Sequence, residues 1–239
     1  MATRPKLPCR LGFMSDKTAE ASQDPGQDPG DWADAAEQRV LDEALRLAPR
    51  LGWNPGLARA AAVAAGLNAG EAQLLLPQGP RDLAALLSRR HDRAALAALG
   101  ALSPPPAKIR DKIRAGVIAR LDAARQDAEA LRKLAAFLAF PTHMPLALTL
   151  VWESADALWR WAGDTATDEN HYSKRAILSG ILVSTLAVDM ASGRESALKH
   201  LDGRIDNVMA FEKWKAGIKP MNLAAEVAAA LARMRYGRG

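Results

Sequence analysis

Apolar residues recur at helical spacing along nearly the whole chain after residue 31, in segments that end at Gly, Pro or a capping residue. Ser103 offers a helix N-cap, with Pro104 at the first helical position. No run alternates as a half-buried strand does, so the pattern predicts an all-α protein of about nine or ten helices. The predicted helices cover about residues 32–51, 53–66, 68–77, 80–99, 104–121, 126–140, 145–163, 170–193 and 196–212.

The two ends of the chain differ from this helical body, which is predicted as one domain over residues 32–212. Residues 1–31 contain the tandem repeat QDPGQDPG, whose Pro and Gly residues disfavour regular structure, so we predict a disordered tail. The first residues are basic and lack the apolar core of a secretory signal. An organelle transit peptide and a true start at Met14 both remain open.

The last segment, residues 213–239, is predicted to form a basic amphipathic helix that binds a membrane surface. It carries six basic residues against Glu226 alone, so its charge of +5 equals the net charge of the whole chain. The alternative is a last helix docked on the core. No run of about 18 uninterrupted apolar residues occurs, so no spanning helix is expected. The predicted membrane-binding residues are Leu223, Val227, Leu231, Met234, Arg233 and Arg235.

Near the start of the body, residues 57–83 resemble the DNA-binding helix-turn-helix of TetR-type repressors, in which the remaining helices enclose a ligand pocket. A ligand-responsive transcription regulator is therefore one functional hypothesis. However, Arg59 and Glu71 are the only charged residues between Asn54 and Pro80. DNA affinity comes largely from Lys and Arg that neutralise phosphates. We therefore predict a vestigial helix-turn-helix and no specific nucleic-acid partner.

Catalytic chemistry has weak support in the sequence. The four histidines are scattered without metal-ligand spacing, and the single cysteine, Cys9, lies in the predicted tail. Asp164, Asp168 and His171 suggest an acid–base group, but turn and capping chemistry explains these residues as well. The prediction is no enzyme, no catalytic residues, no metal and no cofactor.

The polar stretch AGDTATDENHYSKR at residues 162–175 interrupts two strongly apolar segments. Together with its flanks, residues 158–186, it resembles the most characteristic block of the ubiquinone-biosynthesis family Coq-nine. HLDGRIDNVM at residues 200–209 matches a second block of that family, and the similarity covers about residues 33–212. The resemblance implies a TetR-like fold without repressor activity. It also implies binding of isoprenoid lipid or a ubiquinone precursor, and delivery of that precursor to a partner demethoxyubiquinone hydroxylase.

The resemblance further implies that the polar block binds the hydroxylase. Glu169 and His171 replace the phenylalanine and tryptophan that are usual in the family, which changes the expected contact. It implies a peripheral place on the inner membrane, facing the cytoplasm in a bacterium or the matrix in a mitochondrion, and allows a homodimer. The predicted partner-binding residues are Asp168, Asn170, His171, Tyr172 and Arg175.

The lipid pocket is nominated from helical periodicity, because the resemblance gives no individual lining residues. One apolar stripe of the helix at residues 145–163 and part of the next helix are candidates, and plain core packing explains the same stripe equally well. The predicted lipid-binding residues are Leu148, Trp152, Ala155, Trp159, Leu178, Ile181 and Leu182.

Overall fold

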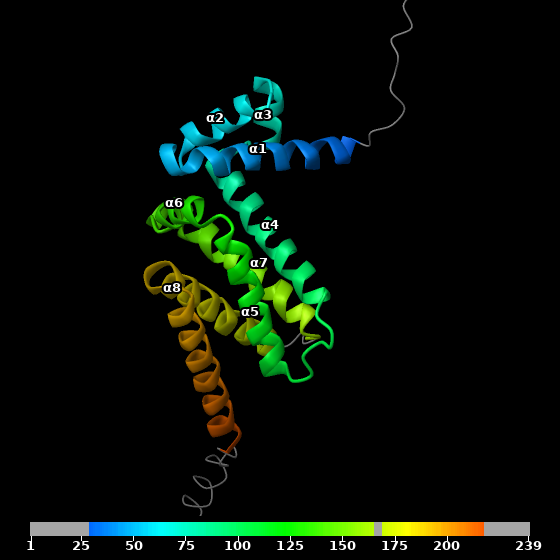
Figure 1. Cartoon of the computed structure of the whole chain (residues 1–239), viewed down its shortest axis with the longest axis vertical. Coiled ribbons are helices and arrows are strands. Elements are labelled where there is room, and N and C mark those ends of the chain that lie inside the picture. The colour runs from blue at the N-terminus through cyan, green and yellow to red at the C-terminus, as the bar shows by residue number, and fades with distance from the viewer. Residues whose placement is uncertain (1–28, 165–168, 218–239) are drawn as a thin grey trace, which may run out of the picture.

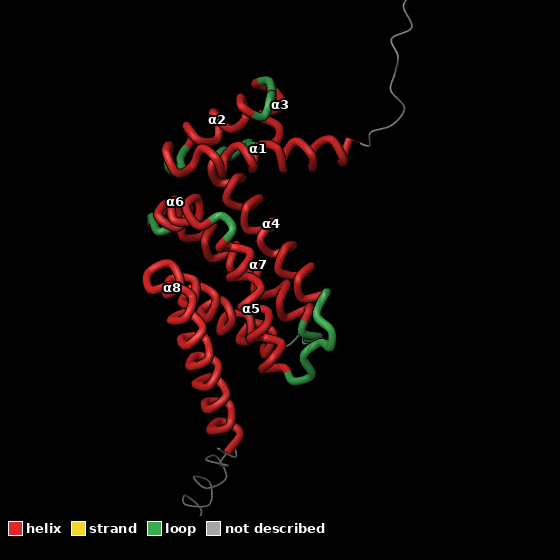
Figure 2. The backbone as a smooth tube through the Cα atoms, viewed as in Figure 1, coloured by secondary structure: helices red, strands yellow, loops and turns green. Residues whose placement is uncertain are grey.

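The computed structural model describes residues 29–164 and 169–217, with side chains for residues 32–164 and 171–208. These residues form helices joined by short loops and contain no strand, which confirms the all-α prediction (Figure 2). The elements are α1 (Pro29–Leu51), α2 (Pro55–Ala64), α3 (Ala69–Leu75), α4 (Pro80–Gly100), α5 (Ile109–Arg125), α6 (Ala128–Leu138), the 3₁₀ turn η1 (Pro141–His143), α7 (Met144–Trp161) and α8 (Glu169–Gly217). Residues 1–28 and 218–239, including most of the predicted tail and all of the predicted membrane-binding residues, lie outside this description. The prediction that the disordered tail extends to residue 31 is wrong at its end, because α1 begins at Pro29.

The helices form a small N-terminal group and a larger bundle, and α4 belongs to both (Figure 1). Helices α1, α2 and α3 lie together at one end, and α4 runs from there along α5 and α7. Helix α8 turns back on itself beside them. This arrangement leaves the middle of the molecule surrounded by α4, α5, α6, α7 and α8.

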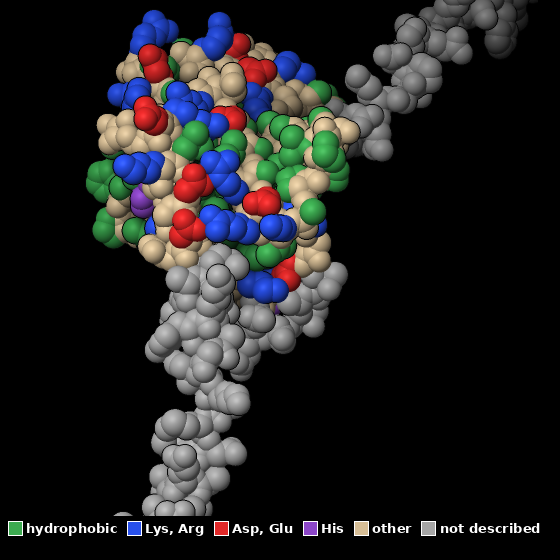
Figure 3. Space-filling model, turned by 60° about the horizontal axis from the view of Figure 1, so that its bottom comes forward, with side chains coloured by type: hydrophobic (Ala, Val, Ile, Leu, Met, Phe, Trp, Pro, Cys, Tyr) green, Lys and Arg blue, Asp and Glu red, His purple; other side chains and the backbone are tan. Residues whose placement is uncertain are grey.

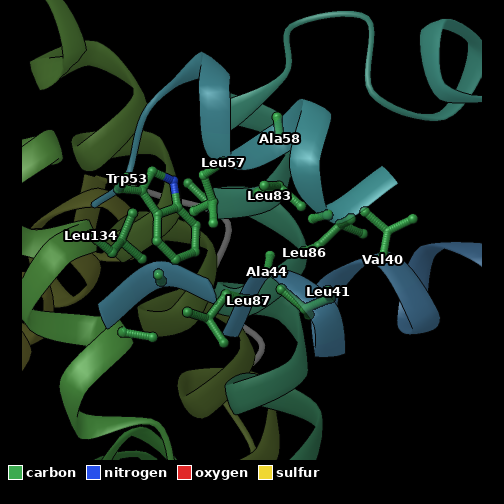
Figure 4. Close-up of a cluster of buried hydrophobic side chains, with 14 of the residues drawn as sticks. Val40, Leu41, Ala44, Trp53, Leu57, Ala58, Leu83, Leu86, Leu87 and Leu134 are labelled. Carbon is green, nitrogen blue, oxygen red and sulfur yellow. The ribbon is translucent and has the colours of Figure 1, made fainter. Parts of the chain in front are cut away.

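The first hydrophobic core joins the N-terminal group to the bundle (Figure 4). Leu41 of α1, Leu57 of α2, and Leu83 and Leu87 of α4 are fully buried there. Trp53 is 5% exposed, and its indole Nε1 donates a 2.8 Å hydrogen bond to the Pro80 carbonyl. Burial of such side chains stabilises the fold by roughly 1.5–3 kcal/mol each, so α1 and α2 are held firmly to the start of α4.

A second core lies at the other end of the bundle, among α4, α5, α7 and α8. Val117, Leu158, Leu178 and Leu201 are its central residues, and each is at most 4% exposed. Leu201 comes from the returning half of α8. This core therefore fixes the position of both halves of α8 against α5 and α7.

The helix-turn-helix predicted near the start is formed by α2 and α3. Gly66, with φ +78°, ends α2, and the Leu67 amide donates to the Ala62 carbonyl in the Schellman pattern. Asn68 and Glu71 then form a reciprocal capping box at the start of α3. Glu71 therefore has a structural role within its own helix, and Arg59 is the one basic residue between Asn54 and Pro80.

The predicted start of α5 at Ser103 and Pro104 is wrong. Helix α5 begins at Ile109, and the Ser103–Pro104 bond is cis. Pro105 and Pro106 follow directly, and each lacks an amide donor and disfavours helical backbone in the residue before it. A helix therefore starts only after this proline run.

Helix α8 consists of two helical segments that meet at Gly193, as the sequence predicted for residues 170–193 and 196–212. Gly193 has φ 81° and ψ 178°, a conformation essentially restricted to glycine. The predicted domain boundary at residues 212 and 213 falls within the second segment. The break lets the second segment return along α5, where Arg114 pairs with Asp202.

By length and composition alone, α8 contains a stretch apolar enough to cross a membrane, a test that core helices also pass, so the expectation of no spanning helix stays a prediction. The stretch lies within His171–Val208, its mean hydropathy is 1.6, and 17% of its residues are buried in the protein. Helix α6 together with η1 and α7, which are bent relative to each other, passes the same test. Two charged residues of the first segment of α8 face the protein body. Arg175 and Asp189 have side chains 2% and 7% exposed and are ion-paired with other residues. The outward side of the first segment of α8, up to Gly193, therefore consists mainly of apolar and small residues. In the second segment Glu195, Lys199 and Arg204 are exposed.

We predict that Gly193→Ala lowers the free energy of unfolding by about 1–3 kcal/mol, because alanine is strained at this φ and ψ. Gly203→Ala, in the regular part of the same helix with open space around the added methyl, is the matched control. It is expected to raise stability by about 0.5–1 kcal/mol. Urea unfolding of both variants measures the difference. Equal effects of the two substitutions would contradict a strained break at Gly193.

Candidate functional site

A cavity of about 340 Å³ lies in the middle of the bundle, between α4, α5, α6, α7 and α8. Most of its wall is aliphatic, with residues from all five helices. This volume is near the lower end of the range of about 300–1,000 Å³ for small-molecule pockets. The apolar lining includes Val117, Leu121, Leu131, Leu134, Leu138, Leu150, Val151, Leu182 and Leu186.

One part of the cavity wall is polar and tightly bonded. Arg120 donates from Nε to Asp92 Oδ1 at 2.6 Å, and Ser154 Oγ donates to Asp92 Oδ2 at 3.0 Å. Arg120 Nη2 also lies 3.5 Å from Ser88 Oγ. Ser88, Arg120 and Ser154 line the cavity, so Asp92 joins α4, α5 and α7 behind its wall. The charge of Arg120 is already compensated by this carboxylate.

His91 lines the cavity one turn after Ser88 and is 3% exposed. Its Nε2 lies 2.9 Å from Asp127 Oδ2. Burial, followed by the nearby positive charge of Arg120, lowers the pKa of this imidazole, and the Asp127 contact opposes that shift only in part. Burial thus favours the neutral form of His91, and Asp92 compensates the charge of Arg120 in the same part of the wall.

The cavity opens to the surface between α7 and α8. Met144 and Val183 line it and are 45% and 55% exposed, respectively. Leu148, 61% exposed, follows Met144 by one helical turn, and Trp152 follows Leu148 by another. An apolar strip along α7 therefore leads away from the cavity mouth.

The predicted lipid-binding stripe does not match the cavity wall, apart from Leu182. Leu148 lies on the surface, Trp152 is half-buried beside it, and Ala155, Trp159, Leu178 and Ile181 pack in the second core. The face of α7 that lines the cavity is Ala147, Leu150, Val151 and Ser154. This face is displaced by one residue from the predicted stripe, which is about 100° around a helix.

The polar stretch at residues 162–175 contains an ionic cluster that ties the end of α7 to the start of α8. Arg175, 2% exposed, donates from Nε to Asp156 at 2.6 Å and from Nη1 to Asp164 at 3.1 Å. Lys174 Nζ binds the second oxygen of Asp164 at 2.6 Å. The hydrogen bond from Lys174, with that from Arg175, lowers the pKa of Asp164. Asp164 is thus an ionised structural group, and it has no free proton for acid–base chemistry.

Only some of the predicted partner-binding residues lie on the surface. Tyr172 is 64% exposed, and its ring stacks 6.2 Å from Trp152 and contacts the edge of the His171 ring at 5.2 Å. The prediction that Arg175 is exposed is wrong, because its guanidinium is buried between the carboxylates of Asp156 and Asp164, with which it pairs. Asp168 and the side chain of Asn170 lie outside the described residues. We call Leu148, Trp152, His171 and Tyr172 the aromatic patch.

Other candidate sites have little support among the described residues. No three His, Cys, Asp or Glu side chains come together there as metal ligands. On the face shown in Figure 3, Lys and Arg side chains are interspersed with Asp and Glu. That face therefore offers no strong field of one sign to an anionic polymer.

The sequence reasoning missed the polar residues of the cavity wall. Their signal was present, because Ser88, His91, Ser154 and Thr185 are polar residues on otherwise apolar helix faces. Each was attributable to ordinary surface exposure until the helices were placed. The packing of α4 against α5 and α7 is what brings them to one cavity.

The chain is similar to known proteins of ubiquinone biosynthesis. Residues 144–212 match the COQ9 family model. The chain is 30% identical over 189 residues to "Ubiquinone biosynthesis protein COQ9-B, mitochondrial" of Xenopus laevis, across 72% of this chain and 62% of that protein. It is 26% identical over 184 residues to the human protein "Ubiquinone biosynthesis protein COQ9, mitochondrial", across 72% of this chain and 57% of that protein. The chain therefore matches about three fifths of the length of these relatives.

We predict that Arg175→Ala lowers the free energy of unfolding by about 3–5 kcal/mol, because it leaves Asp156 and Asp164 without their buried partner. Arg160→Ala is the matched control, since Arg160 also pairs with Asp156 but is 73% exposed. It is expected to cost at most about 1 kcal/mol. Denaturant unfolding compares them, and an equally small effect of both would argue against a structural anchor at Arg175.

Proposed function

This chain belongs, through residues 144–212, to the COQ9 family, and we propose that it is a lipid-binding accessory protein of ubiquinone biosynthesis. In this proposal it binds an isoprenoid quinone precursor and presents it to a demethoxyubiquinone hydroxylase. The observation that carries the proposal is the apolar cavity, whose mouth continues into the aromatic patch. It is proposed as a carrier and not as an enzyme.

Lipid binding is supported by the composition of the cavity wall. Aliphatic side chains from five helices surround the space, and burial of an apolar ligand against them contributes roughly 25 cal/mol per Å² of apolar surface. The few polar wall groups are mostly bonded to each other through Asp92. Such a wall suits a mainly apolar ligand with a small polar part.

Presentation to a partner is supported by the position of the cavity mouth. Met144 at the mouth, Leu148 and Trp152 follow one another at intervals of four residues, and Trp152 stacks on Tyr172. A protein bound on the aromatic patch would therefore sit beside the opening. Exposed aromatic residues are typical energetic anchors of protein interfaces.

A TetR-type regulator is the less favoured alternative. Its support is the α2–α3 helix-turn-helix, but Glu71 of that motif caps α3 and Arg59 is the one basic residue between Asn54 and Pro80. Few phosphate contacts imply weak, salt-sensitive DNA binding. Specific nucleic acid is therefore not part of the proposal.

A membrane is the proposed source of the lipid. The outward side of the first segment of α8, which exposes no charged residue between positions 171 and 193, and the basic segment at residues 213–239 both suit contact with a membrane surface. In that segment Leu223, Val227, Leu231 and Met234 are proposed to enter the headgroup boundary, while Arg233 and Arg235 contact anionic lipid. The proposed location is peripheral, on the mitochondrial inner membrane facing the matrix, or on its bacterial counterpart facing the cytoplasm.

We predict that Ala135→Phe lowers the amount of isoprenoid lipid that co-purifies with the protein at least severalfold, because Ala135 lines the cavity and the larger ring occupies it. Ala136→Phe, at the next and exposed position of α6, is the matched control and is expected to retain the lipid. Mass spectrometry of extracted lipid gives the readout. Absence of isoprenoid lipid from the wild-type protein would refute the proposal.

We predict that Tyr172→Ala weakens binding to the hydroxylase by about 2 kcal/mol, roughly thirtyfold, because Tyr172 is the exposed anchor of the aromatic patch. His171→Trp, which restores the family residue, is expected to strengthen the complex. Leu74→Ala, 72% exposed on α3, is the control for loss of an exposed apolar side chain elsewhere. Titration with the purified hydroxylase measures all three, and unchanged affinity of Tyr172→Ala would remove the patch from the interface.

A further inference from the structure

Thr185 on α8 is a buried polar residue that has no hydrogen-bond partner. Its side chain is 0% exposed, it lines the cavity, and its Oγ1 finds no donor or acceptor among the described residues. A threonine inside a helix commonly bonds to the carbonyl of the preceding turn. Since a buried unpaired hydroxyl costs roughly 1–3 kcal/mol, this atom calls for a partner that the protein itself does not supply.

Thr185 and Val183 lie on different sides of the same helix. They are two residues apart, which is about 200° around a helix. Val183 is 55% exposed at the mouth, whereas Thr185 faces the protein interior. The cavity therefore has an apolar opening and a hydroxyl within.

The polar groups of the wall suit an uncharged ligand group. Arg120 is compensated by Asp92, and His91 is held beside Asp127 in an almost fully buried position. A phosphate would need a cation that is free to pair with it. A ring bearing carbonyl, hydroxyl or methoxy oxygens instead needs a neutral donor or acceptor, which Thr185 supplies.

The size of the cavity sets how much of the ligand it contains. A space of about 340 Å³ suits a substituted ring with its first isoprene units, and a long isoprenoid chain exceeds it. The remainder of such a chain must leave by the mouth. Outside the mouth it meets Leu148 and the apolar strip that continues to Trp152.

We propose that the ligand binds ring first, with a ring oxygen hydrogen-bonded to Thr185 Oγ1 and the isoprenoid tail leaving between Met144 and Val183. This inference rests on the proposed lipid-carrier function and adds the orientation of the ligand and its specificity-determining residue. In this orientation the ring is withheld from solvent, and the tail lies under any partner bound at the aromatic patch. The ring reaches the partner only if the ligand then slides out.

The experiment measures binding of two probes to the full chain by native mass spectrometry. One probe is a benzoquinone that carries two isoprene units, and the other is farnesene, a ring-free isoprenoid hydrocarbon. Thr185→Val, which removes the hydroxyl but keeps the shape, is expected to weaken quinone binding about tenfold, the effect of one hydrogen bond. It is expected to leave farnesene binding unchanged.

Two further variants control this comparison. Thr185→Ser keeps the hydroxyl and is expected to retain quinone binding. Thr149→Val removes an exposed threonine hydroxyl that bonds to Pro145, outside the cavity, and is expected to change neither probe. Thermal unfolding of each variant checks that the bundle remains folded.

The outcomes separate the orientation from the carrier function. Selective loss of the quinone in Thr185→Val, with rescue in Thr185→Ser, supports ring-first binding. Wild-type protein that binds both probes, with Thr185→Val binding them equally well or losing both alike, overturns ring-first binding and leaves the carrier function standing. Wild-type protein that binds neither probe overturns both.

Discussion

The buried guanidinium of Arg175 holds the end of α7 to the start of α8, and the candidate site depends on that junction. One side chain binds Asp156 of α7 and Asp164 of the connecting turn, and also donates to the His171 carbonyl at 3.1 Å. Lys174 adds a second cation to Asp164. The positions of the cavity mouth and of Tyr172 both follow from how these two helices meet. A buried charge is tolerated here because every strong group in the cluster is paired.

The buried polar side chains of the cavity wall are also paired, with one exception among the described residues. Around Asp92, the polar groups of α4, α5 and α7 satisfy one another and close one part of the cavity wall. Thr185 is left out of this network. A wall that combines a satisfied polar network with one unsatisfied hydroxyl fits the proposed binding site, in which the ligand supplies the last partner.

The outward surface of α7 and α8 has the opposite character to the buried network. In the first segment of α8, Arg175 and Asp189 face the body, where Asp189 pairs with Arg125, so apolar and aromatic groups remain outside. Exposure of such a surface to water is unfavourable, and its burial by a protein or lipid lowers the free energy. The cavity mouth lies on this surface, which connects the two parts of the proposed function in one place.

The sequence by itself determined the helices, since local rules govern them. Apolar periodicity, with Gly66 and Gly193 as helix ends, placed most boundaries within a few residues. It also carried the family resemblance, because the order of polar residues at 162–175 is not required by helix formation. It placed Tyr172 correctly on the surface. These features depend on neighbours within a few positions of the chain.

Only the tertiary structure decided which face of each helix meets the cavity. On α7, the predicted stripe and the stripe one residue away have the same periodicity, so the sequence offered no reason to prefer Leu150 over Leu148 as a buried residue. In the structure Leu148 is exposed and Leu150 is buried. The burial of Arg175 depended on Asp156, which is nineteen positions away. Thr185 lines a cavity only because α4, α5, α6 and α7 pack around it, and the sequence near Thr185 does not specify that packing. Packing between distant parts of the chain sets the rotation of each helix about its axis and the pairing of its polar side chains. Those two features define the site.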